Sequence, residues 1–265
     1  MNNLENVIAK LRELCLQGGK EAMQHYCNLG KIITKSDQSP LTQADLAVDA
    51  IIVEGLRDAF PKIPIVTEER ASNHQTGYAT GKFFLVDPID GTKEFINQNG
   101  EFTINIALIE NGNPVAGVVF APALGRLFWG AEGLGAFEED ENGNSHALEL
   151  HETDNDALII FASRSHLTPE TEAFIAANKV SEIKTAGSSL KFCLIAAGEA
   201  DLYPRFGPTM EWDVAAGHAV LAAAGGCVFR LDGNPIAYGQ KHYRSPYFIA
   251  KTQAAEFVFA KADAS

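Results

Sequence analysis

The stretch FFLVDPIDGT (residues 83–92) places two aspartates directly after an apolar run. The run predicts a buried strand, and Pro88 and Gly91 predict that it breaks into a tight turn, because proline fixes φ and glycine accepts backbone conformations that other residues resist. Asp87 and Asp90 then share the end of the strand, where two unpaired anions facing one point would repel unless a cation lies between them. Mg²⁺, a hard divalent cation, suits such a carboxylate pair. An aspartate-rich turn whose side chains bond to their own backbone is the alternative.

The composition predicts a globular, intracellular protein. With 265 residues, 46% hydrophobic and 21% charged, the chain can bury one large core or two modest ones. Its four cysteines form no C-x-x-C pair, which favours reduced thiols over a disulfide scaffold. The sequence shows neither a membrane span nor the layout of a signal peptide. We therefore expect a cytoplasmic protein, with peripheral association at the inner face of the cell membrane left open.

The formal net charge of −13 argues against a nucleic acid as partner, because proteins that bind nucleic acids usually present a basic face. A small anionic substrate is compatible with this charge if metal ions occupy an acidic site, since the ions invert its local electrostatics. Most of the 34 acidic residues are explained equally well as solvated surface groups. The net charge alone therefore identifies no site.

Hydrophobic periodicity predicts two amphipathic helices, followed by closely spaced strands, in the first half of the chain. Asn111-Gly112 lies between two of these strands and is a hairpin signal, so we expect an antiparallel sheet. The predicted helices cover residues 3–28 and 42–59, and the predicted strands cover residues 83–86, 103–109, 115–120 and 126–131.

Beyond His151 the pattern changes to alternating strands and helices, which is typical of an α/β arrangement. We expect two packed lobes, residues 1–150 and 151–265, with a boundary near residues 145–156 and a site in the cleft between them. The predicted strands lie at residues 158–162, near residue 202 and at 228–229, and the predicted helices begin at residue 169 and cover residues 190–197 and 214–224.

Further acids stand where strands end or helices begin. Asp213 falls in the first turn, or at the N-cap, of a predicted helix, where capping explains it but a third carboxylate would also complete a metal site. Glu68 follows a short apolar strand, and Asp45 is spaced from Thr42 like a capping box. Capping alone accounts for Asp45. Only its occurrence together with the other motifs of the chain suggests a further role.

Four segments resemble the inositol monophosphatase superfamily of Mg²⁺-dependent, lithium-sensitive phosphatases. In chain order they are TQAD (42–45), TEE (67–69), VDPIDGT (86–92) and WDVAAG (212–217). Four more segments resemble the bacterial 3′(2′),5′-bisphosphate nucleotidases of that superfamily, whereas inositol monophosphatases usually have Thr-Asn-Phe after the Gly-Thr. These are GTKEFI (91–96), SRSH (163–166), GSSLKFC (187–193) and YPRFGPT (203–209). The resemblance covers about residues 35–250, with a departure at Glu211, where many relatives are apolar.

The resemblance implies an α/β fold layered as an αβαβα sandwich of the inositol monophosphatase and sugar phosphatase type. It also implies two Mg²⁺ ions. One ion is placed on Glu68, Asp87 and the carbonyl of Ile89. The second is placed on Asp90 and Asp213, with Asp87 bridging the two ions. A third, weakly held Mg²⁺ is placed at Glu68.

The same resemblance assigns a water-activating dyad and a substrate pocket. Thr92 and Asp45 resemble the pair that orients and deprotonates the attacking water. Backbone amides of Gly91 and Thr92 would cradle the scissile phosphate, and basic and hydroxyl side chains would bind the uncleaved phosphate and the adenosine. Each of those side chains is also explained as a surface polar residue or a cap, as Ser188 is by the helix after it. The implied substrate-binding set is Glu68, Ile89, Asp90, Gly91, Thr92, His166, Ser188, Lys191, Arg205 and Asp213.

Three functions fit these residues. The first is a nucleotidase that hydrolyses adenosine 3′,5′-bisphosphate to AMP and phosphate, with 3′-phosphoadenylyl sulfate as a further substrate. The second is an inositol or sugar phosphatase with the same metal chemistry. The third is a non-catalytic metal or nucleotide sensor, which would have no need of the Asp45 and Thr92 dyad. In each case the partner is a small molecule, with no nucleic acid and no membrane span, and the oligomeric state is not predicted.

Overall fold

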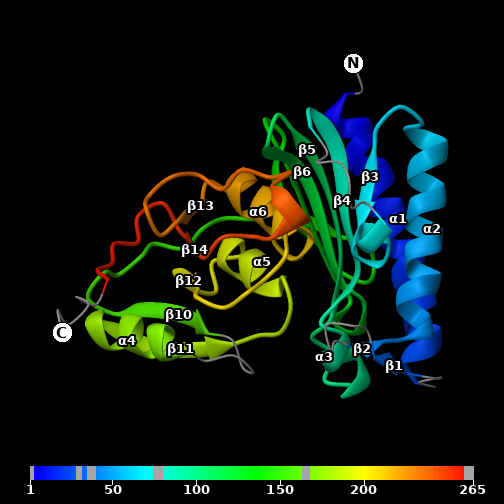
Figure 1. Ribbon diagram of the computed structural model, residues 1–265. Coiled ribbons are helices and arrows are strands. Elements are labelled where there is room, and N and C mark those ends of the chain that lie inside the picture. The colour runs from blue at the N-terminus through cyan, green and yellow to red at the C-terminus, as the bar shows by residue number, and fades with distance from the viewer. Residues whose placement is uncertain (1–2, 28–31, 35–39, 74–79, 163–167, 260–265) are drawn as a thin grey trace.

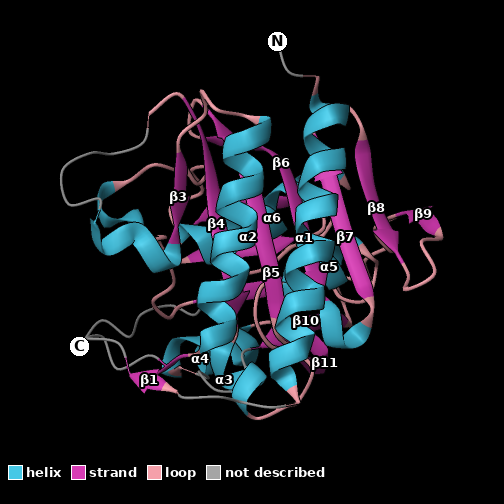
Figure 2. Ribbon diagram, turned by 90° about the vertical axis from the view of Figure 1, so that its right-hand side faces the viewer, coloured by secondary structure: helices cyan, strands magenta, loops and turns pink. Residues whose placement is uncertain are grey.

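The computed structural model describes residues 3–27, 32–34, 40–73, 80–162 and 168–259, and these residues form alternating layers of helices and sheets (Figure 1). One outer layer consists of α1 (Leu4–Tyr26) and α2 (Gln43–Ala59), which lie side by side across a seven-stranded sheet (Figure 2). The middle layer consists of α5 (Leu190–Ala196) and α6 (Glu211–Ala223). A five-stranded sheet and α4 (Pro169–Ala177) complete the arrangement. The predicted αβαβα sandwich is therefore confirmed.

The seven-stranded sheet has the order β3-β4-β5-β6-β7-β8-β9. Its β3–β4 pair is parallel and the other pairs are antiparallel, which confirms the predicted antiparallel sheet. Asn111 and Gly112 both have positive φ, 52° and 81°, in the tight turn between β5 and β6. The strands are β3 (Ile65–Thr67), β4 (Lys82–Asp90), β5 (Thr103–Glu110), β6 (Asn113–Ala121), β7 (Arg126–Ala131), β8 (Gly135–Glu139) and β9 (Ser145–Ala147).

The five-stranded sheet is mixed and has the order β11-β10-β12-β14-β13. The predicted strands correspond to β10, β12 and β13, whereas β11 and β14 were not predicted. Edge strand β11 has the sequence VSEIKT and is mostly exposed, so it lacks the apolar pattern that marks a strand. The strands are β10 (Leu158–Ala162), β11 (Val180–Thr185), β12 (Leu202–Arg205), β13 (Cys227–Arg230) and β14 (Phe248–Lys251).

Short elements complete the described chain. A small antiparallel pair, β1 with β2, precedes α2, and α3 follows β4. None of the described helices is long and apolar enough to cross a membrane. The remaining elements are β1 (Ile33–Thr34), β2 (Pro40–Leu41), α3 (Thr92–Ile96), and the 3-10 helices η1 (Glu68–Asn73), η2 (Pro122–Leu124) and η3 (Lys241–Tyr243).

Helix α6 is buried because it packs against the seven-stranded sheet on one side and faces the second sheet on the other. Gly117 of β6 permits this close approach: a Cβ there would lie 2.5 Å from the carbonyl oxygen of Ala216. The core between the sheets includes Phe83 from the first half of the chain and Phe248 from the second. The predicted boundary near residues 145–156 includes β9 and most of the segment before β10, and the division into two lobes stays a prediction.

The end of β4 differs from the expectation, because the strand does not break at Pro88 but continues to Asp90. The register passes from Asp87 opposite Asn105 to Asp90 opposite Thr103, so β4 contains one extra residue at this point. Such an irregularity tolerates a proline, which has no N–H for the ladder. The turn comes at Gly91, with φ of 87°. Since Asn105 and Thr103 are two residues apart on β5, the extra residue lets Asp87 and Asp90 occupy the same face of the sheet.

Candidate active site

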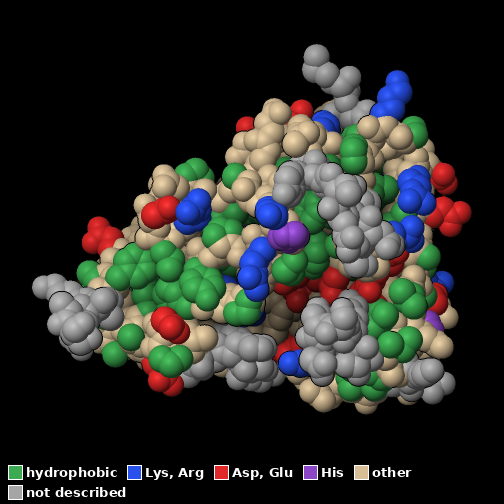
Figure 3. Space-filling view, viewed as in Figure 1, with side chains coloured by type: hydrophobic (Ala, Val, Ile, Leu, Met, Phe, Trp, Pro, Cys, Tyr) green, Lys and Arg blue, Asp and Glu red, His purple; other side chains and the backbone are tan. Residues whose placement is uncertain are grey.

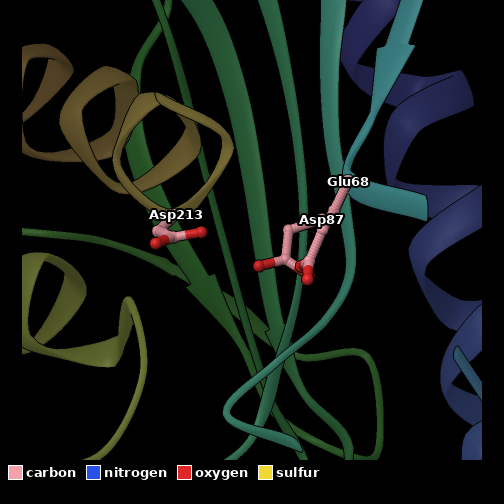
Figure 4. A group of neighbouring side chains, drawn as sticks. All are labelled: Glu68, Asp87 and Asp213. Carbon is pink, nitrogen blue, oxygen red and sulfur yellow. The ribbon is translucent and has the colours of Figure 1, made fainter. Parts of the chain in front are cut away.

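Three carboxylates from distant parts of the chain meet beside the seven-stranded sheet (Figure 4). Glu68 begins η1 directly after β3, Asp87 lies near the end of β4, and Asp213 is in the first turn of α6. One oxygen of each lies within 4.8 Å of the others. Asp213 Oδ2 also accepts hydrogen bonds from Thr209 Oγ1 at 2.7 Å and from the backbone N–H of Met210 at 3.0 Å. The predicted meeting of Glu68, Asp87 and Asp213 is thus seen in the structure.

The cluster is electrostatically suited to a cation. Burial, together with the carboxylates of Glu68, Asp90 and Asp213, raises the pKa of Asp87 well above its ordinary value. Burial and Glu68 raise the pKa of Asp213 to about 6, against smaller opposing effects that include Arg205. These carboxylate oxygens, one buried and two partly buried, repel one another in the absence of a cation and fit a hard divalent ion such as Mg²⁺.

Asp90 lies next to this cluster but is not within the same 4.8 Å group. Its Oδ2 accepts a hydrogen bond of 2.6 Å from the backbone N–H of Ser189, at the start of α5. The hydroxyl of Ser189 is in turn bonded to Asn105 Oδ1 at 2.7 Å and to Thr103 Oγ1 at 2.9 Å. Burial and Asp213 raise the pKa of Asp90, against the opposing effect of Lys191. The position of Asp90 therefore depends on contacts from the second half of the chain.

The structure brings Asp45 and Thr92 together across 47 residues of sequence. Thr42 caps α2, and Asp45 Oδ2 accepts hydrogen bonds from Thr42 N at 2.8 Å and from Thr42 Oγ1 at 2.5 Å. The other oxygen, Asp45 Oδ1, lies 3.4 Å from Thr92 Oγ1, which is equally far from the carbonyl oxygen of Ile89. Since a hydroxyl donates one proton, Thr92 can bond to either acceptor. The capping box and the proposed dyad thus coexist in one arrangement.

A cleft opens beside these acids. Its wall includes Gly91, Thr92 and Asp213, together with the basic side chains of Lys191 and Arg205. Figure 3 shows acidic side chains inside the hollow at the centre of this face, with basic side chains beside it. Carboxylates that can hold cations therefore adjoin groups that can bind an anion.

A sequence profile of the inositol monophosphatase family matches residues 3–264. The chain belongs to the inositol monophosphatase family. A solved structure of the same family is similar to this chain. A crystal structure of CysQ from Bacteroides thetaiotaomicron, described as a bacterial member of the inositol monophosphatase family, superposes with a TM-score of 0.79 at 37% identity. The match covers 95% of this chain and 99% of that one, which confirms the layered fold.

Relatives of this inositol monophosphatase family member include proteins named 3′(2′),5′-bisphosphate nucleotidase CysQ. The one from Shigella flexneri is 43% identical over 228 residues, which cover 85% of this chain and 91% of that protein. The one from Buchnera aphidicola is 41% identical over 242 residues, 90% of each chain. The resemblance to bacterial bisphosphate nucleotidases that the motifs predicted is therefore confirmed.

The placement of two residues predicted to bind substrate differs in part from the expectation. Ser188 is not the N-cap of α5, because that position is taken by Ser189. With φ of 45°, Ser188 donates its hydroxyl to the carbonyl oxygen of Glu101 at 3.0 Å. Residue His166 lies outside the described residues. The predicted contacts of Ser188 and His166 with substrate stay predictions.

The two basic residues of the cleft differ in how much of their bonding capacity is used. Lys191 is buried and donates from Nζ to the carbonyl oxygens of Ala186 at 3.0 Å and Ser188 at 2.6 Å. Burial lowers its pKa to about 8, although Asp90 opposes this effect. Arg205 donates from Nη2 to the carbonyl oxygen of Pro208 at 2.9 Å, while its buried Nε has no partner among the described residues. Arg205 therefore retains more capacity to bind an anion.

Sequence reasoning missed several residues that support this site. Ser189, Thr103 and Asn105 hold Asp90 through contacts separated by more than 80 residues, so no local pattern indicates them. An ion pair between Asp49 and Arg70 was also missed. The spacing of Asp49 could have indicated that it lies near the site, because a residue one helical turn beyond Asp45 shares a face of the helix with it.

Proposed function

We propose that this chain is a Mg²⁺-dependent phosphatase that removes the 3′-phosphate of adenosine 3′,5′-bisphosphate, giving AMP and phosphate. 3′-Phosphoadenylyl sulfate is a further substrate in this proposal. The observation that carries it is the carboxylate cluster beside the Asp45 and Thr92 pair, in a chain 43% identical to a protein named 3′(2′),5′-bisphosphate nucleotidase. The cluster supports the metal chemistry, and the identity supports the substrate class.

Glu68, Asp87 and Asp213 would hold Mg²⁺, with Asp90 and the carbonyl of Ile89 as further ligands. We propose two ions that share Asp87, and a third, weakly held ion at Glu68. Bound Mg²⁺ supplies a lowered pKa for water and positive charge for the attacking and leaving oxygens of the phosphate.

The residues of the chain then orient the water and move its proton. Thr92 Oγ1 donates its own proton to Asp45 Oδ1 and can accept a hydrogen bond from the attacking water. Thr42 fixes the Asp45 carboxylate through two hydrogen bonds to Oδ2, while Oδ1 lies 3.4 Å from Thr92 Oγ1. As the water oxygen bonds to phosphorus and the bond to the 3′-oxygen breaks, the proton of the water passes through Thr92 to Asp45, and the leaving 3′-oxygen takes up a proton from solvent water to become the 3′-hydroxyl of AMP. Backbone amides of Gly91 and Thr92 would hold the phosphate oxygens meanwhile.

The uncleaved 5′-phosphate would lie against Arg205, whose Nε is free to donate, and near Lys191. An Arg guanidinium suits phosphate because it presents several donors in a fixed plane. Lys191 contributes charge from a buried position while two of its donor sites hold the backbone before α5. Ser188 and His166 complete the proposed nucleotide contacts.

A phosphate-release assay tests the substrate class. We expect Mg²⁺-dependent turnover of adenosine 3′,5′-bisphosphate with a much higher kcat/KM than that of inositol 1-phosphate, and no turnover in EDTA. A preference for inositol 1-phosphate would replace the proposal with the inositol phosphatase alternative. Absence of turnover with both substrates, while Mg²⁺ still binds, would favour the sensor.

A further inference from the structure

An ion pair connects the segment that contains Glu68 with the helix that contains Asp45. Arg70 in η1 donates from Nε to Asp49 Oδ2 at 2.7 Å, and its Nη2 lies 2.6 Å from the same oxygen. The side chain of Asp49 is only 4% exposed and that of Arg70 is 38% exposed. A buried carboxylate bonded by two nitrogens of one guanidinium is held in a defined place.

Both partners are close in sequence to residues of the proposed site. Asp49 follows Asp45 by one turn of α2, so the two carboxylates share a face of that helix. Arg70 follows Glu68 by two residues in η1, which packs against α2. The ion pair therefore spans the gap between the element with the proposed base and the element with a proposed metal ligand.

The charges around α2 show why this pair matters. Two buried carboxylates one turn apart repel each other unless positive charge is near. The oxygens of Asp45 are bonded to Thr42 and Thr92, whereas Asp49 Oδ1 is buried and has no hydrogen-bond partner in the described part of the chain. Arg70 thus supplies the positive charge for Asp49, and loss of Arg70 would leave a buried anion beside Asp45.

We propose that Arg70 and Asp49 are positioning residues, whose ion pair fixes Glu68 relative to Asp45 and so sets the affinity of the site for Mg²⁺. This inference rests on the proposed function, because it takes Glu68 as a metal ligand. Residues that orient metal ligands typically change metal affinity or activity by about 10- to 100-fold when they are removed. We therefore expect Arg70→Gln to weaken Mg²⁺ binding by at least roughly tenfold on that basis.

A set of variants separates positioning from simple stability. The set is Asp49→Asn, Arg70→Gln, the double variant and Arg70→Lys. The double variant removes both charges and leaves no unpaired buried ion, so it should recover much of the thermal stability lost in Arg70→Gln. Its weakened Mg²⁺ binding should persist, because the contact between η1 and α2 is still missing. Arg70→Lys keeps the charge without the two-nitrogen contact and should give an intermediate Mg²⁺ affinity.

Arg126 and Glu138 provide a matched control. Arg126 Nε and Nη2 bond to the two oxygens of Glu138 at 2.5 and 3.0 Å, with 29% and 11% of the side chains exposed, and Nη2 also lies 3.0 Å from Glu199 Oε1. This pair joins β7 and β8, and β7 is three strands away from β4 in the sheet. Arg126→Gln and the double variant with Glu138→Gln should lower the melting temperature but leave the Mg²⁺ affinity unchanged.

The measurement is calorimetric titration of the metal-free proteins with Mg²⁺, combined with melting temperatures and phosphate release from adenosine 3′,5′-bisphosphate. Weaker Mg²⁺ binding in Arg70→Gln and in the double variant, with the control unchanged, supports the inference. Wild-type Mg²⁺ affinity in the double variant, or an equal loss in the control, overturns it. If wild type binds Mg²⁺ but releases no phosphate, the proposed function fails, while the calorimetric comparison still decides the role of the ion pair.

Discussion

Asp87→Asn should stabilise the metal-free protein and abolish its activity. Asp87 is buried beside Glu68 and Asp213, with oxygens of the three within 4.8 Å of one another. At the upper limit of that separation, two full charges repel by about 3.5 kcal/mol for an effective dielectric constant of about 20. The cluster relieves part of this repulsion by holding protons, as the raised pKa values of Asp87 and Asp213 indicate. We therefore expect a net gain of about 2 kcal/mol on removing the charge.

The sign of this effect depends on pH. A carboxyl whose pKa is raised on folding binds more protons in the folded state than in the unfolded state. Its ionisation therefore lowers the free energy of unfolding as the pH rises above the ordinary pKa, and the loss is complete above the raised pKa. For Asp213 that range extends from 3.8 to about 6. At about pH 7.5 in EDTA the Asp213 carboxyl is therefore ionised, and its repulsion of the neighbouring carboxylates is present. Asparagine keeps the shape of the side chain and can still accept the 3.1 Å hydrogen bond from Ile89 N.

The assay is thermal unfolding of wild type and Asp87→Asn, in EDTA and in millimolar Mg²⁺. In EDTA the variant should melt roughly 5 °C higher, the shift expected from about 2 kcal/mol in a chain of this size. Added Mg²⁺ should raise the melting temperature of wild type but hardly that of the variant, since an ion stabilises only a fold that binds it. A variant that melts below wild type in EDTA, or that keeps its Mg²⁺-dependent turnover, would refute the reasoning.

Three further predictions follow from other parts of the site and core. Thr92→Val should lower kcat by about 10²- to 10⁴-fold through loss of the proton path to Asp45, while the Mg²⁺ affinity measured by calorimetry stays unchanged. An unaltered kcat would contradict the proposed role of Thr92 and Asp45 in activating water. Arg205→Ala should reduce kcat/KM for adenosine 3′,5′-bisphosphate by roughly ten- to a hundredfold and that for adenosine 3′-monophosphate far less, because only the bisphosphate uses the contact; equal losses would contradict this role. His218 is buried, which lowers its pKa to about 4, so the stability that its neutral form contributes is complete above about pH 6.5 and is lost as the pH falls toward 4. His218→Gln should remove up to about 3 kcal/mol of that pH dependence, and unfolding curves for wild type and variant that stay parallel from pH 7 to 4 would disprove the assignment.

Local sequence patterns predicted the parts of the site that lie within single segments. The apolar run before Asp87 predicted β4, and the spacing of Thr42 and Asp45 predicted a capping box that the structure contains. The prediction that the strand breaks at Pro88 was wrong. The extra residue in β4 accommodates the proline, and the turn comes at Gly91. Periodicity and turn chemistry do not show where such an extra residue enters a strand.

Local sequence patterns could not predict the long-range contacts, for a physical reason. Asp90 is held by Ser189, and Asp49 by Arg70, and both pairs form only when separate elements pack together. The residue type of Lys191 predicted a phosphate partner but not its burial or its hydrogen bonds to two backbone carbonyls, and its contact with substrate stays a prediction. Whether a polar side chain is exposed or buried depends on the layers around it, which the local sequence does not specify.

The central claim is that Mg²⁺ bound at the carboxylate cluster supports hydrolysis of a 3′-phosphate beside a retained 5′-phosphate. Phosphorus NMR of adenosine 3′,5′-bisphosphate incubated with the protein tests this directly, because the two phosphates give separate signals. With Mg²⁺ present, the 3′ signal should disappear, inorganic phosphate should appear, and the 5′ signal should persist as AMP. Loss of the 5′ signal instead, or an equal rate in EDTA, would contradict the account.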